Sequence, residues 1–465
     1  MDLERVIAAL APREVVGRAP VEVADLAYDT RAVAPGALFF CVRGANVDGH
    51  ELAPQALEAG AAALVVERPV AAQVPQLVVV DSRAAMAVAA DVFFGHPTHE
   101  LDVVGVTGTN GKTTTAHLVY AILAAAGRRP GLLGTIEARL AGERRPVVRT
   151  TPEAIDLQRT FREMLDAGDK SCAMEASSHA SELHRLDRVR FAALVFTNLT
   201  PDHLDFHGTI ERYFDAKRRL FAGDDPPPAA INVDDPWGRK LAAERPDALT
   251  FGVAAAGAQI GPDALEGIEL KLRGRFNVAN ALGALAAARL LGIDDEATAR
   301  GLEAVRGVPG RFESVDEGQP FEVIVDYSHT PDSLENALRA ARDLAAGRVL
   351  CVFGCGGDRD REKRPLMGRI AAELADVPIL TTDNPRSEDP LAIIDEVVRG
   401  TSGELEVEPD RRAAITRAVE AAREGDVVLV AGRGAEPAQE VAGRKLPFDD
   451  RDVAREALRR IQAAA

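Results

Sequence analysis

The stretch GVTGTNGKTTT, residues 105–115, lies between the apolar run LDVVGV at 101–106 and the run TTTAHLVYAILAAAG at 113–127. The first run predicts a strand and the second a helix, so the glycine-rich stretch forms the turn between them. Small residues in such a turn leave backbone N–H groups free to bind phosphate oxygens, while Lys112 reaches the outer phosphates and the Thr113 hydroxyl can ligate magnesium. The glycine spacing departs from G-x-x-x-x-G-K-[ST], and a purely structural turn is the alternative. The strand–turn–helix placement favours a nucleotide site.

Composition narrows the class of protein. A chain of 465 residues with 46% hydrophobic content predicts about three domains with real cores. The formal net charge of −17 disfavours binding to nucleic acid or to an anionic membrane surface. No apolar run approaches the roughly 18 residues of a membrane span, and the start MDLERVIAALAPREVV does not read as a signal peptide. We therefore expect a cytoplasmic protein without membrane insertion. The few cysteines lack zinc-knuckle spacing and are expected to be buried thiols: Cys41, Cys172, Cys351 and Cys355.

Alternating strand and helix patterns predict an α/β fold in three domains, over residues 1–97, 98–309 and 310–465. The first holds short β-type runs around a helical segment and ends near the pair His96–Pro97. The second begins with the phosphate loop, and its last helix is expected at 276–292. The third alternates strands and helices of a length that predicts a mostly parallel sheet covered on both faces.

Two strand ends of the middle region carry candidate chemistry. Glu175 lies near the end of the strand in MEASSH (174–179), where a carboxylate can hold magnesium; the alternative is a buried glutamate bonded by neighbouring hydroxyls. The segment FTNLTPDHLDFHG (196–208) concentrates Asp202, His203, Asp205 and His207; the two histidines suggest zinc only weakly, because no cysteine or third histidine lies nearby. Lys217, amid a predicted helix, reads as a solvated surface charge on residue properties alone.

The predicted sheet of the third region ends in four polar segments that should gather at one rim. They are VDYSHTP (325–331), FGCGGDRDREKRP (353–365), TDNPRSEDP (382–390) and AGRGAEP (431–437). Helix-capping turns would explain each of them singly. Arg359 and Arg386 offer planar forks for a carboxylate, whereas Asp383 and Glu436 can hold an ammonium group. This combination of charges suits an amino-acid ligand.

Ordered motifs along the whole chain give it a family resemblance. They are TGTNGKTTT, TTPEA, MEASSH, TNLTPDHLDFH, DAKRRLF, FNVANA, GRFE, VDYSHTPDSLENAL, FGCGGDRDREKRPLMG and TDNPR. In this order they resemble the Mur ligases of peptidoglycan synthesis, and most of all the members that add the third amino acid to UDP-N-acetylmuramoyl-L-alanyl-D-glutamate. Folylpolyglutamate synthase and cyanophycin synthetase share the phosphate loop but are not expected to carry TTPEA, MEASSH and DNPR together.

The resemblance implies a fold and a reaction. It implies an N-terminal uridine-binding domain, a central ATP-binding domain with a P-loop and a C-terminal Rossmann-like domain that binds the incoming amino acid. ATP would phosphorylate the γ-carboxylate of the D-glutamate, and an amine would attack the acyl phosphate. The implied catalytic residues are Lys112, Glu175, His203 and Lys217. Lys217 matches a lysine that is carbamylated in this family, and Mg²⁺ would be bound by Thr113, Glu175, His203 and carbamylated Lys217.

The resemblance also implies three binding sets. The ATP set is Gly108, Thr109, Asn110, Gly111, Lys112, Thr113, Thr114, Asn277, Arg311, Asp326 and His329. The UDP-substrate set is Asp29, Thr30, Arg31, Thr150, Thr151, Ser177 and Arg185. The amino-acid set is Arg359, Asp383, Asn384, Pro385, Arg386, Gly432 and Glu436, and its DNPR sequence resembles the signature for meso-diaminopimelate. The implied partners are therefore the UDP-muramoyl dipeptide and a diamino acid, handled by an expected monomer.

The sequence departs from the family pattern in a few places. GRGAE replaces the common GKGHE, so Arg433 stands for lysine and Ala435 for histidine; Leu183 stands where some relatives carry glutamine. The segment 254–272 looks short, as if a hairpin were missing. These departures bear on the amino acid more than on the ligase reaction. L-lysine or another diamino acid is the main alternative, and a polyglutamate-type ligase, a phosphotransferase or a non-catalytic nucleotide-binding protein is more remote.

Overall fold

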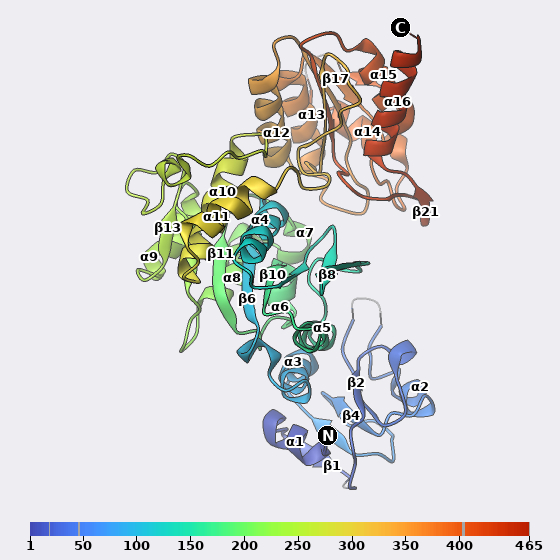
Figure 1. The fold of residues 1–465 in the computed structure, drawn as a ribbon. Coiled ribbons are helices and arrows are strands. Elements are labelled where there is room, and N and C mark those ends of the chain that lie inside the picture. Colours follow the sequence, from blue (N-terminus) through green and yellow to red (C-terminus); the bar gives the residue numbers. More distant parts are fainter. Residues whose placement is uncertain (18, 45–46, 402–404, 465) are drawn as a thin grey trace. The chain divides into compact units, whose positions relative to one another are not determined.

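The computed structural model describes residues 1–17, 19–44, 47–401 and 405–464 (Figure 1). Its chain divides into two compact units, each assembled from separate stretches. The first unit comprises Met1–Thr107, Gly127–Val195 and Ala216–Ala229. The second comprises Gly108–Ala126, Phe196–Asp215 and Ala230–Ala465. The predicted α/β class is confirmed, while the domain boundaries after residues 97 and 309 stay predictions.

A five-stranded sheet opens the first unit, in the order β1-β5-β4-β3-β2. Its strands are β1 (Glu14–Val16), β2 (Asp25–Ala27), β3 (Ala37–Phe40), β4 (Ala63–Val66) and β5 (Gln76–Val78), and only β1 runs antiparallel. Side chains alternate between the two faces: Leu38 and Phe40 pack with α1 (Leu3–Leu10) and α3 (Ser82–Phe93), whereas Phe39 packs with α2 (Ala53–Glu58). Both faces are thus buried, as a mostly parallel sheet requires.

The first unit also contains the strands that lead into the phosphate loop, in the order β11-β6-β10-β7-β8-β9. They are β6 (Asp102–Thr107), β7 (Pro130–Leu133), β8 (Ala138–Leu140), β9 (Glu143–Arg145), β10 (Ser171–Glu175) and β11 (Phe191–Phe196). β10 runs parallel to β6 and β7, and its last residue, Glu175, lies opposite Val106. Helices α5 (Ala154–Asp166) and α6 (Ser178–Glu182) precede and follow β10. This register brings Glu175 to the strand ends from which the loop departs.

The second unit begins with α4 (Lys112–Ala125), which packs against α10 (Phe276–Leu290) and α11 (Asp295–Ala304). The prediction that residues 276–292 form the last helix before residue 309 is wrong, because α11 follows. Its contact surface uses small residues: a Cβ on Gly301 would lie 2.4 Å from the Ile122 Cα. Close packing through glycine and alanine leaves only a weak apolar periodicity in the sequence. Other elements of this part are α7 (Leu204–His207), α8 (Ile210–Arg218), α9 (Pro236–Glu244), β12 (Ala229–Asn232) and β13 (Leu249–Phe251).

A six-stranded sheet completes the second unit, in the order β14-β15-β19-β16-β17-β18. Its strands are β14 (Glu313–Ser314), β15 (Glu322–Asp326), β16 (Val349–Phe353), β17 (Val377–Leu380), β18 (Glu406–Val407) and β19 (Val427–Ala431), and only β14 runs antiparallel. Helices α12 (Pro331–Leu344), α13 (Lys363–Leu374) and α14 (Pro390–Val398) cover one face. Helices α15 (Arg411–Ala421) and α16 (Asp450–Ala464) cover the other (Figure 1). The predicted mostly parallel sheet with two covered faces is confirmed.

A hairpin of β20 (Ala438–Val441) and β21 (Arg444–Pro447) follows the last polar strand end, and the sequence reading missed it. Its residues are half-buried or exposed, so they show no strong apolar alternation. All four cysteines are buried and free, as expected. Within the described ranges, no helix has both the length and the hydropathy that crossing a bilayer demands.

Candidate active site

The phosphate loop, Gly108–Thr114, depends on two glycines that approach other side chains closely. Gly108 has φ 149°, and a Cβ there would lie 1.9 Å from the Thr197 Oγ1. Gly111 has φ 85°, and its Cβ would lie 2.3 Å from the Asn280 Oδ1. Any side chain at either position would be strained and would collide with a hydrogen-bonding group. The Lys112 Nζ donates to the carbonyls of Gly108 and Thr109, at 3.0 and 2.8 Å.

The segment that follows β11 holds the loop in place. The Thr197 Oγ1 donates to the Asn110 carbonyl at 2.6 Å, and the Asn110 N–H donates to the Asn198 Oδ1 at 2.9 Å. The Thr200 N–H donates to the Thr109 Oγ1 at 3.0 Å. The sequence reading noticed this segment for its histidines and aspartates and missed the roles of Asn198 and Thr200. Their signal was the run of hydrogen-bonding residues directly after a buried strand.

Arg311 links the loop to the polar end of β15. Its Nη2 donates to the Thr113 Oγ1 at 3.0 Å, and its guanidinium carbon lies 4.3 Å from the centre of the Tyr327 ring. The Asp326 Oδ2 accepts from the Phe312 N–H at 2.7 Å and so fixes the backbone beside Arg311. Asn277 is buried and accepts from the Asn280 amide at 2.8 Å. The residues predicted to bind ATP therefore all lie within the second unit. Asn280 lies between Asn277 and the loop.

Charged groups gather near the same segment. Asp202 and His203 lie 3.4 Å apart. Burial raises the pKa of Asp202, but nearby His203, His329, Lys363 and Lys112 outweigh it, so the pKa lies below its ordinary value. Burial, reinforced by Lys363, lowers the pKa of His329. Asp202 is therefore ionised and His329 is largely neutral, in surroundings suited to anionic phosphates.

In the first unit, Glu175 and the two threonines of TTPEA form one network. Glu175 is buried and accepts from the Thr135 N–H at 2.7 Å and the Thr135 Oγ1 at 3.1 Å. The Thr151 Oγ1 donates to the Glu175 carbonyl at 2.7 Å and to the Ser177 Oγ at 3.2 Å. The Thr150 and Thr135 hydroxyls lie 3.0 Å apart. Glu175 thus lies at the strand end, as predicted for a metal ligand. It is also bonded by a neighbouring hydroxyl, as predicted for the alternative of a purely structural buried glutamate.

Arg185 joins this network through Glu153, a residue that the sequence reading quoted without a role. The Arg185 Nη1 donates to the Thr151 carbonyl at 3.1 Å, and its Nη2 lies 2.8 Å from the Glu153 Oε1. Glu153 is buried and also pairs with Arg83 at 3.2 Å and Arg149 at 3.4 Å. Burial lowers the pKa of Arg185. One carboxylate therefore orients three guanidinium groups beside the predicted dipeptide residues.

The predicted uridine residues form a separate local structure. Asp29 accepts from the Arg31 N–H at 3.0 Å and pairs with the Arg31 guanidinium at 2.5 Å, while the Arg31 side chain is 87% exposed. Thr30 begins the short helix Thr30–Ala32. The neighbouring Tyr28 hydroxyl donates to the Asp156 Oδ2 at 2.6 Å and so ties this loop to α5.

The predicted amino-acid residues converge at the ends of β17 and β19. The Asn384 Nδ2 donates to the Glu436 Oε2 at 2.8 Å, and the Tyr327 hydroxyl donates to the Glu436 Oε1 at 3.2 Å. Gly432 has φ 123°, and a Cβ there would lie 2.4 Å from the Asp383 Oδ2. Burial, together with the charge of Asp383, raises the pKa of Glu436. We call Asp383, Asn384, Arg386, Gly432 and Glu436 the amino-acid pocket, after the role that the sequence predicts for them.

Arg386 and Arg359 differ in how firmly they are held. The Arg386 Nη1 donates to the Gly357 carbonyl at 2.6 Å, and its backbone, with φ 54°, bridges to Val441 in the hairpin. Arg359 is exposed, and its Nη1 donates locally, to the Asp358 carbonyl at 2.9 Å. Pro385 supplies the carbonyl that lies 2.0 Å from a Cβ placed on Gly357. Arg386 is thus the prepositioned guanidinium of the predicted pair.

Known proteins match this chain along its length. Three family profiles cover residues 22–105 (Mur ligase family, catalytic domain), 106–288 (Mur ligase middle domain) and 310–434 (Mur ligase, glutamate ligase domain). The UDP-N-acetylmuramoyl-L-alanyl-D-glutamate–2,6-diaminopimelate ligase of Geobacillus thermodenitrificans is 47% identical, over 94% of this chain and 95% of that protein. This chain belongs to the Mur ligase family.

Solved structures of Mur ligases agree. A UDP-N-acetylmuramoyl-L-alanyl-D-glutamate–2,6-diaminopimelate ligase superimposes with a TM-score of 0.68 and 30% identity, over 99% of both chains. A MurF ligase from Thermotoga maritima in complex with ADP superimposes with a TM-score of 0.62 and 21% identity, over 95% of this chain and 99% of that one. The second likeness establishes the shared fold alone.

Lys217 is placed differently from what residue properties predicted. Its side chain is 1% exposed, so the expectation of a solvated surface charge is wrong. Tyr213 and Phe214, four and three residues earlier on α8, are buried too, and residues at this spacing share one helix face. The buried face of α8 therefore carries a lysine among apolar residues. Only the family resemblance singled it out.

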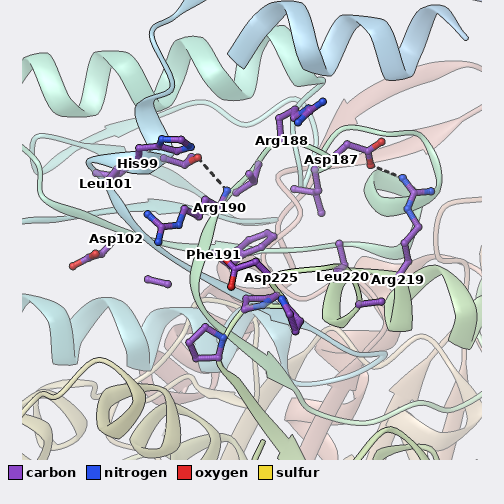
Figure 2. Close-up of a pocket in the computed structure, with 18 of the residues that line it drawn as sticks. His99, Leu101, Asp102, Asp187, Arg188, Arg190, Phe191, Arg219, Leu220 and Asp225 are labelled. Carbon is purple, nitrogen blue, oxygen red and sulfur yellow. Dashed lines mark hydrogen bonds and ion pairs between the residues drawn. The ribbon is translucent and has the colours of Figure 1, made fainter. Parts of the chain in front are cut away.

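A cavity of about 930 Å³ in the first unit lies apart from all predicted residues (Figure 2). It is lined by the first residues of β6 and β11, Asp102 and Phe191, together with His99 and Arg190. The phosphate loop leaves β6 at its opposite end, a strand length of roughly 20 Å away. Ligands of parallel α/β sheets bind at the carboxyl ends of strands, so this cavity is not the centre of the Mur ligase reaction.

Proposed function

We propose that this Mur ligase adds meso-diaminopimelate to UDP-N-acetylmuramoyl-L-alanyl-D-glutamate with hydrolysis of ATP to ADP and phosphate. The observation that carries the proposal is the amino-acid pocket: Asp383 and Glu436 offer carboxylates, and Arg386 offers a held guanidinium, within the same unit as the phosphate loop. Near-complete overlap with relatives that are named for this reaction supports it. The reaction so proposed takes place in the cytoplasm and requires no second subunit.

The chemistry proceeds in two transfers. A carboxylate is a poor electrophile, so the γ-carboxylate oxygen of D-glutamate first attacks the γ-phosphorus of ATP, and ADP leaves. The incoming amine then attacks the carbonyl carbon of the acyl phosphate, loses a proton and expels inorganic phosphate. Both steps depend on positioning and charge stabilisation rather than on a covalent bond to the enzyme. Lys112 and the backbone N–H groups of the loop neutralise the phosphates of ATP.

The family resemblance assigns Mg²⁺ to Thr113, in the second unit, and to Glu175, in the first. Taken singly, the Thr113 hydroxyl and the Glu175 carboxylate are oxygen donors of the type that Mg²⁺ prefers. Mg²⁺, when bound, would neutralise charge on the phosphates. His203 is assigned to a second metal, and Lys217 to metal binding after carbamylation, on the family resemblance alone. The burial of Lys217 is compatible with a modified side chain that serves a site rather than solvent.

Selection of the amino acid rests on charge. Arg386 and Arg359 bind the distal carboxylate of diaminopimelate, while Asp383 and Glu436 bind its distal ammonium group. L-Lysine lacks that carboxylate and would leave a guanidinium without its anion, at a cost of roughly 2–5 kcal/mol. The pocket therefore favours diaminopimelate over lysine.

The test is mass spectrometry of the product, with phosphate release, from the purified protein, ATP, Mg²⁺ and the UDP-muramoyl dipeptide. Parallel reactions contain meso-diaminopimelate, L-lysine or no amino acid. A product heavier by one diaminopimelate residue, absent with lysine, is expected. Incorporation of lysine instead would overturn the specificity, and phosphate release without an amide would overturn the ligase assignment.

A further inference from the structure

A buried cluster of charges lies beneath the amino-acid pocket, at the starts of α15 and α16. The Arg411 Nε and Nη2 donate to the two carboxylate oxygens of Asp450, at 2.8 and 2.6 Å. The Arg411 Nη2 also donates to the Ala431 carbonyl, the last residue of β19, at 3.0 Å. Both side chains of this pair are fully buried. The pair carries no net charge and is held rigidly, and the loop after β19 packs against it.

Arg433 lies between the Arg411–Asp450 pair and Glu436. Its side chain is 1% exposed and its Nη2 donates to the Phe448 carbonyl at 3.2 Å. Its Nη1 lies 3.8 Å from the Asp450 Oδ1, and its Nε lies 3.8 Å from the Glu436 Oε2. Within the part of the chain that the structure describes, the Nε and Nη1 have no hydrogen-bond partner. Arg433 thus acts on Glu436 through its charge and not through a hydrogen bond.

The charges of the cluster do not cancel. Three carboxylates, those of Asp383, Glu436 and Asp450, face two guanidinium groups, those of Arg411 and Arg433. Within the described residues the Asp383 Oδ2 is buried without a hydrogen-bond partner, beside the space that Gly432 leaves open. One negative charge therefore remains for a cationic ligand, and it is shared between Asp383 and Glu436.

We propose that Arg433 is a positioning residue that keeps Glu436 ionised, and so sets the lowest pH at which the pocket binds the ammonium group of the incoming amino acid. This inference rests on the proposed function and deepens it. Arg433 does not contact the amino acid, because its guanidinium is enclosed between Phe448, Asp450 and Glu436. Its positive charge offsets the effect of Asp383, a like charge that faces Glu436 from the end of β17.

The direction of the pH dependence follows from the groups around Glu436. Burial and Asp383 raise the pKa of Glu436, whereas Asn384, Arg433 and Tyr327 lower it. Arg411 adds a more distant positive charge, and Arg311 lies over the Tyr327 ring. A carboxylate binds an ammonium group only when ionised, so the KM for the amino acid falls as pH rises through this pKa. Removal of the Arg433 charge raises the pKa further and moves that acid limb to higher pH.

The experiment measures the KM for meso-diaminopimelate between pH 5.5 and 9.5 in the wild type, Arg433→Met and Arg433→Lys, with ATP and UDP-muramoyl dipeptide saturating. We expect the acid limb of Arg433→Met to lie about one pH unit higher, since an opposite charge at this distance shifts a pKa by about 1 unit or more. On that limb its KM is about tenfold above the wild-type value at the same pH. Arg433→Lys keeps the charge and the position of the limb.

Arg412→Met is the matched control. The Arg412 guanidinium carbon lies 5.7 Å from the same Phe448 ring over which Arg433 lies at 5.1 Å, but Arg412 is half-exposed and pairs with Glu456. It should leave the limb unchanged. An unshifted limb in Arg433→Met, or a KM lost equally at every pH in Arg433→Met and Arg433→Lys, would overturn the inference in favour of a packing role. Should Arg433→Met fail to fold, Arg433→Gln, which also removes the charge, takes its place with the same expected shift and the same contradicting outcomes. A wild type that does not incorporate diaminopimelate would overturn the proposed function instead.

Discussion

The phosphate loop and the amino-acid pocket lie in the same unit but are built in different ways. The loop is shaped by backbone: glycines at 108 and 111 take positive φ, and its N–H and carbonyl groups bond to the segment after β11. The pocket is shaped by side chains, because Glu436 is held by Asn384 and Tyr327 from two other strand ends. Few sequences can form a binding site that is shaped by backbone, whereas a single substitution can change the charge of a site that is shaped by side chains. Two departures from the family pattern, Arg433 and Ala435, lie between Gly432 and Glu436 of the pocket, whereas Leu183 lies in the first unit.

The largest expected effect tests the loop. Lys112→Ala removes the one side-chain cation that the loop itself supplies, and the ligase rate should fall about 1,000-fold, because charge stabilisation dominates phosphoryl transfer. Phosphate release and product mass measure the loss. Lys240→Ala, a lysine that stacks on Trp237 in the same unit, is the control and should retain activity. If the ligase rate of Lys112→Ala stayed within tenfold of the wild-type rate, the loop would have no role in the reaction.

The next effect tests the pocket. Arg386→Ala should raise the KM for meso-diaminopimelate about 100-fold, since a guanidinium that binds a desolvated carboxylate contributes about 3 kcal/mol. The KM for ATP should change less than threefold, because the loop is built independently of this side chain. Steady-state kinetics with each substrate varied provide the measurement, and Arg444→Ala in the exposed strand β21 is the control. Equal losses for ATP and the amino acid would mean that the two regions are not separable.

A third test asks whether binding of the UDP-muramoyl dipeptide depends on positioned side chains, as in the pocket, or on backbone groups, as in the loop. Glu153→Gln removes the charge that orients Arg185, Arg83 and Arg149, and we expect the KM for the UDP-muramoyl dipeptide to rise about tenfold, within the range for loss of a buried charged partner. The kcat should stay within about threefold. Glu163→Gln, which removes an exposed partner of Arg145, should leave both parameters as in the wild type. A loss confined to kcat would contradict a binding role.

The smallest expected effect concerns a support of the pocket. Arg364 is fully buried; it bonds to Glu388 and Glu396 and donates to the Gly356 carbonyl at 3.2 Å. The hydrogen bond from Arg361, aided by Arg364, lowers the pKa of Glu396 to about 2. A lowered carboxyl pKa stabilises the fold above the ordinary value of 4.5, and this contribution disappears as pH falls from there towards 2.

Glu396→Gln should therefore lower the melting temperature by about 2 °C at pH 7, the effect of about 1 kcal/mol in a domain of this size. The difference from the wild type should shrink as pH falls below about 4.5. Thermal unfolding at pH 7, 4 and 3 measures it, with Glu335→Gln, which removes an exposed partner of Arg339, as the control. A difference that stays constant with pH would assign the loss to packing rather than to charge.

The sequence by itself determined the α/β class, the strand and helix on either side of the phosphate loop, the mostly parallel sheet of the third region and the family. These features depend on apolar periodicity and on short motifs, which are local properties of the chain. Local signals failed where contacts use small residues, as in α11, or where polar residues make a hairpin, as in β20 and β21.

Only the tertiary structure decided which distant side chains meet. Glu153 is 32 residues from Arg185, Asp450 is 39 residues from Arg411, and Asn384 is 52 residues from Glu436. No periodicity encodes such pairs, because each depends on which ends of strands and helices the fold places side by side. The burial of Lys217 was decided in the same way, by the face of α8 that packs inward. Sequence thus specified the elements and the motif chemistry, and packing specified the charge environment in which that chemistry operates.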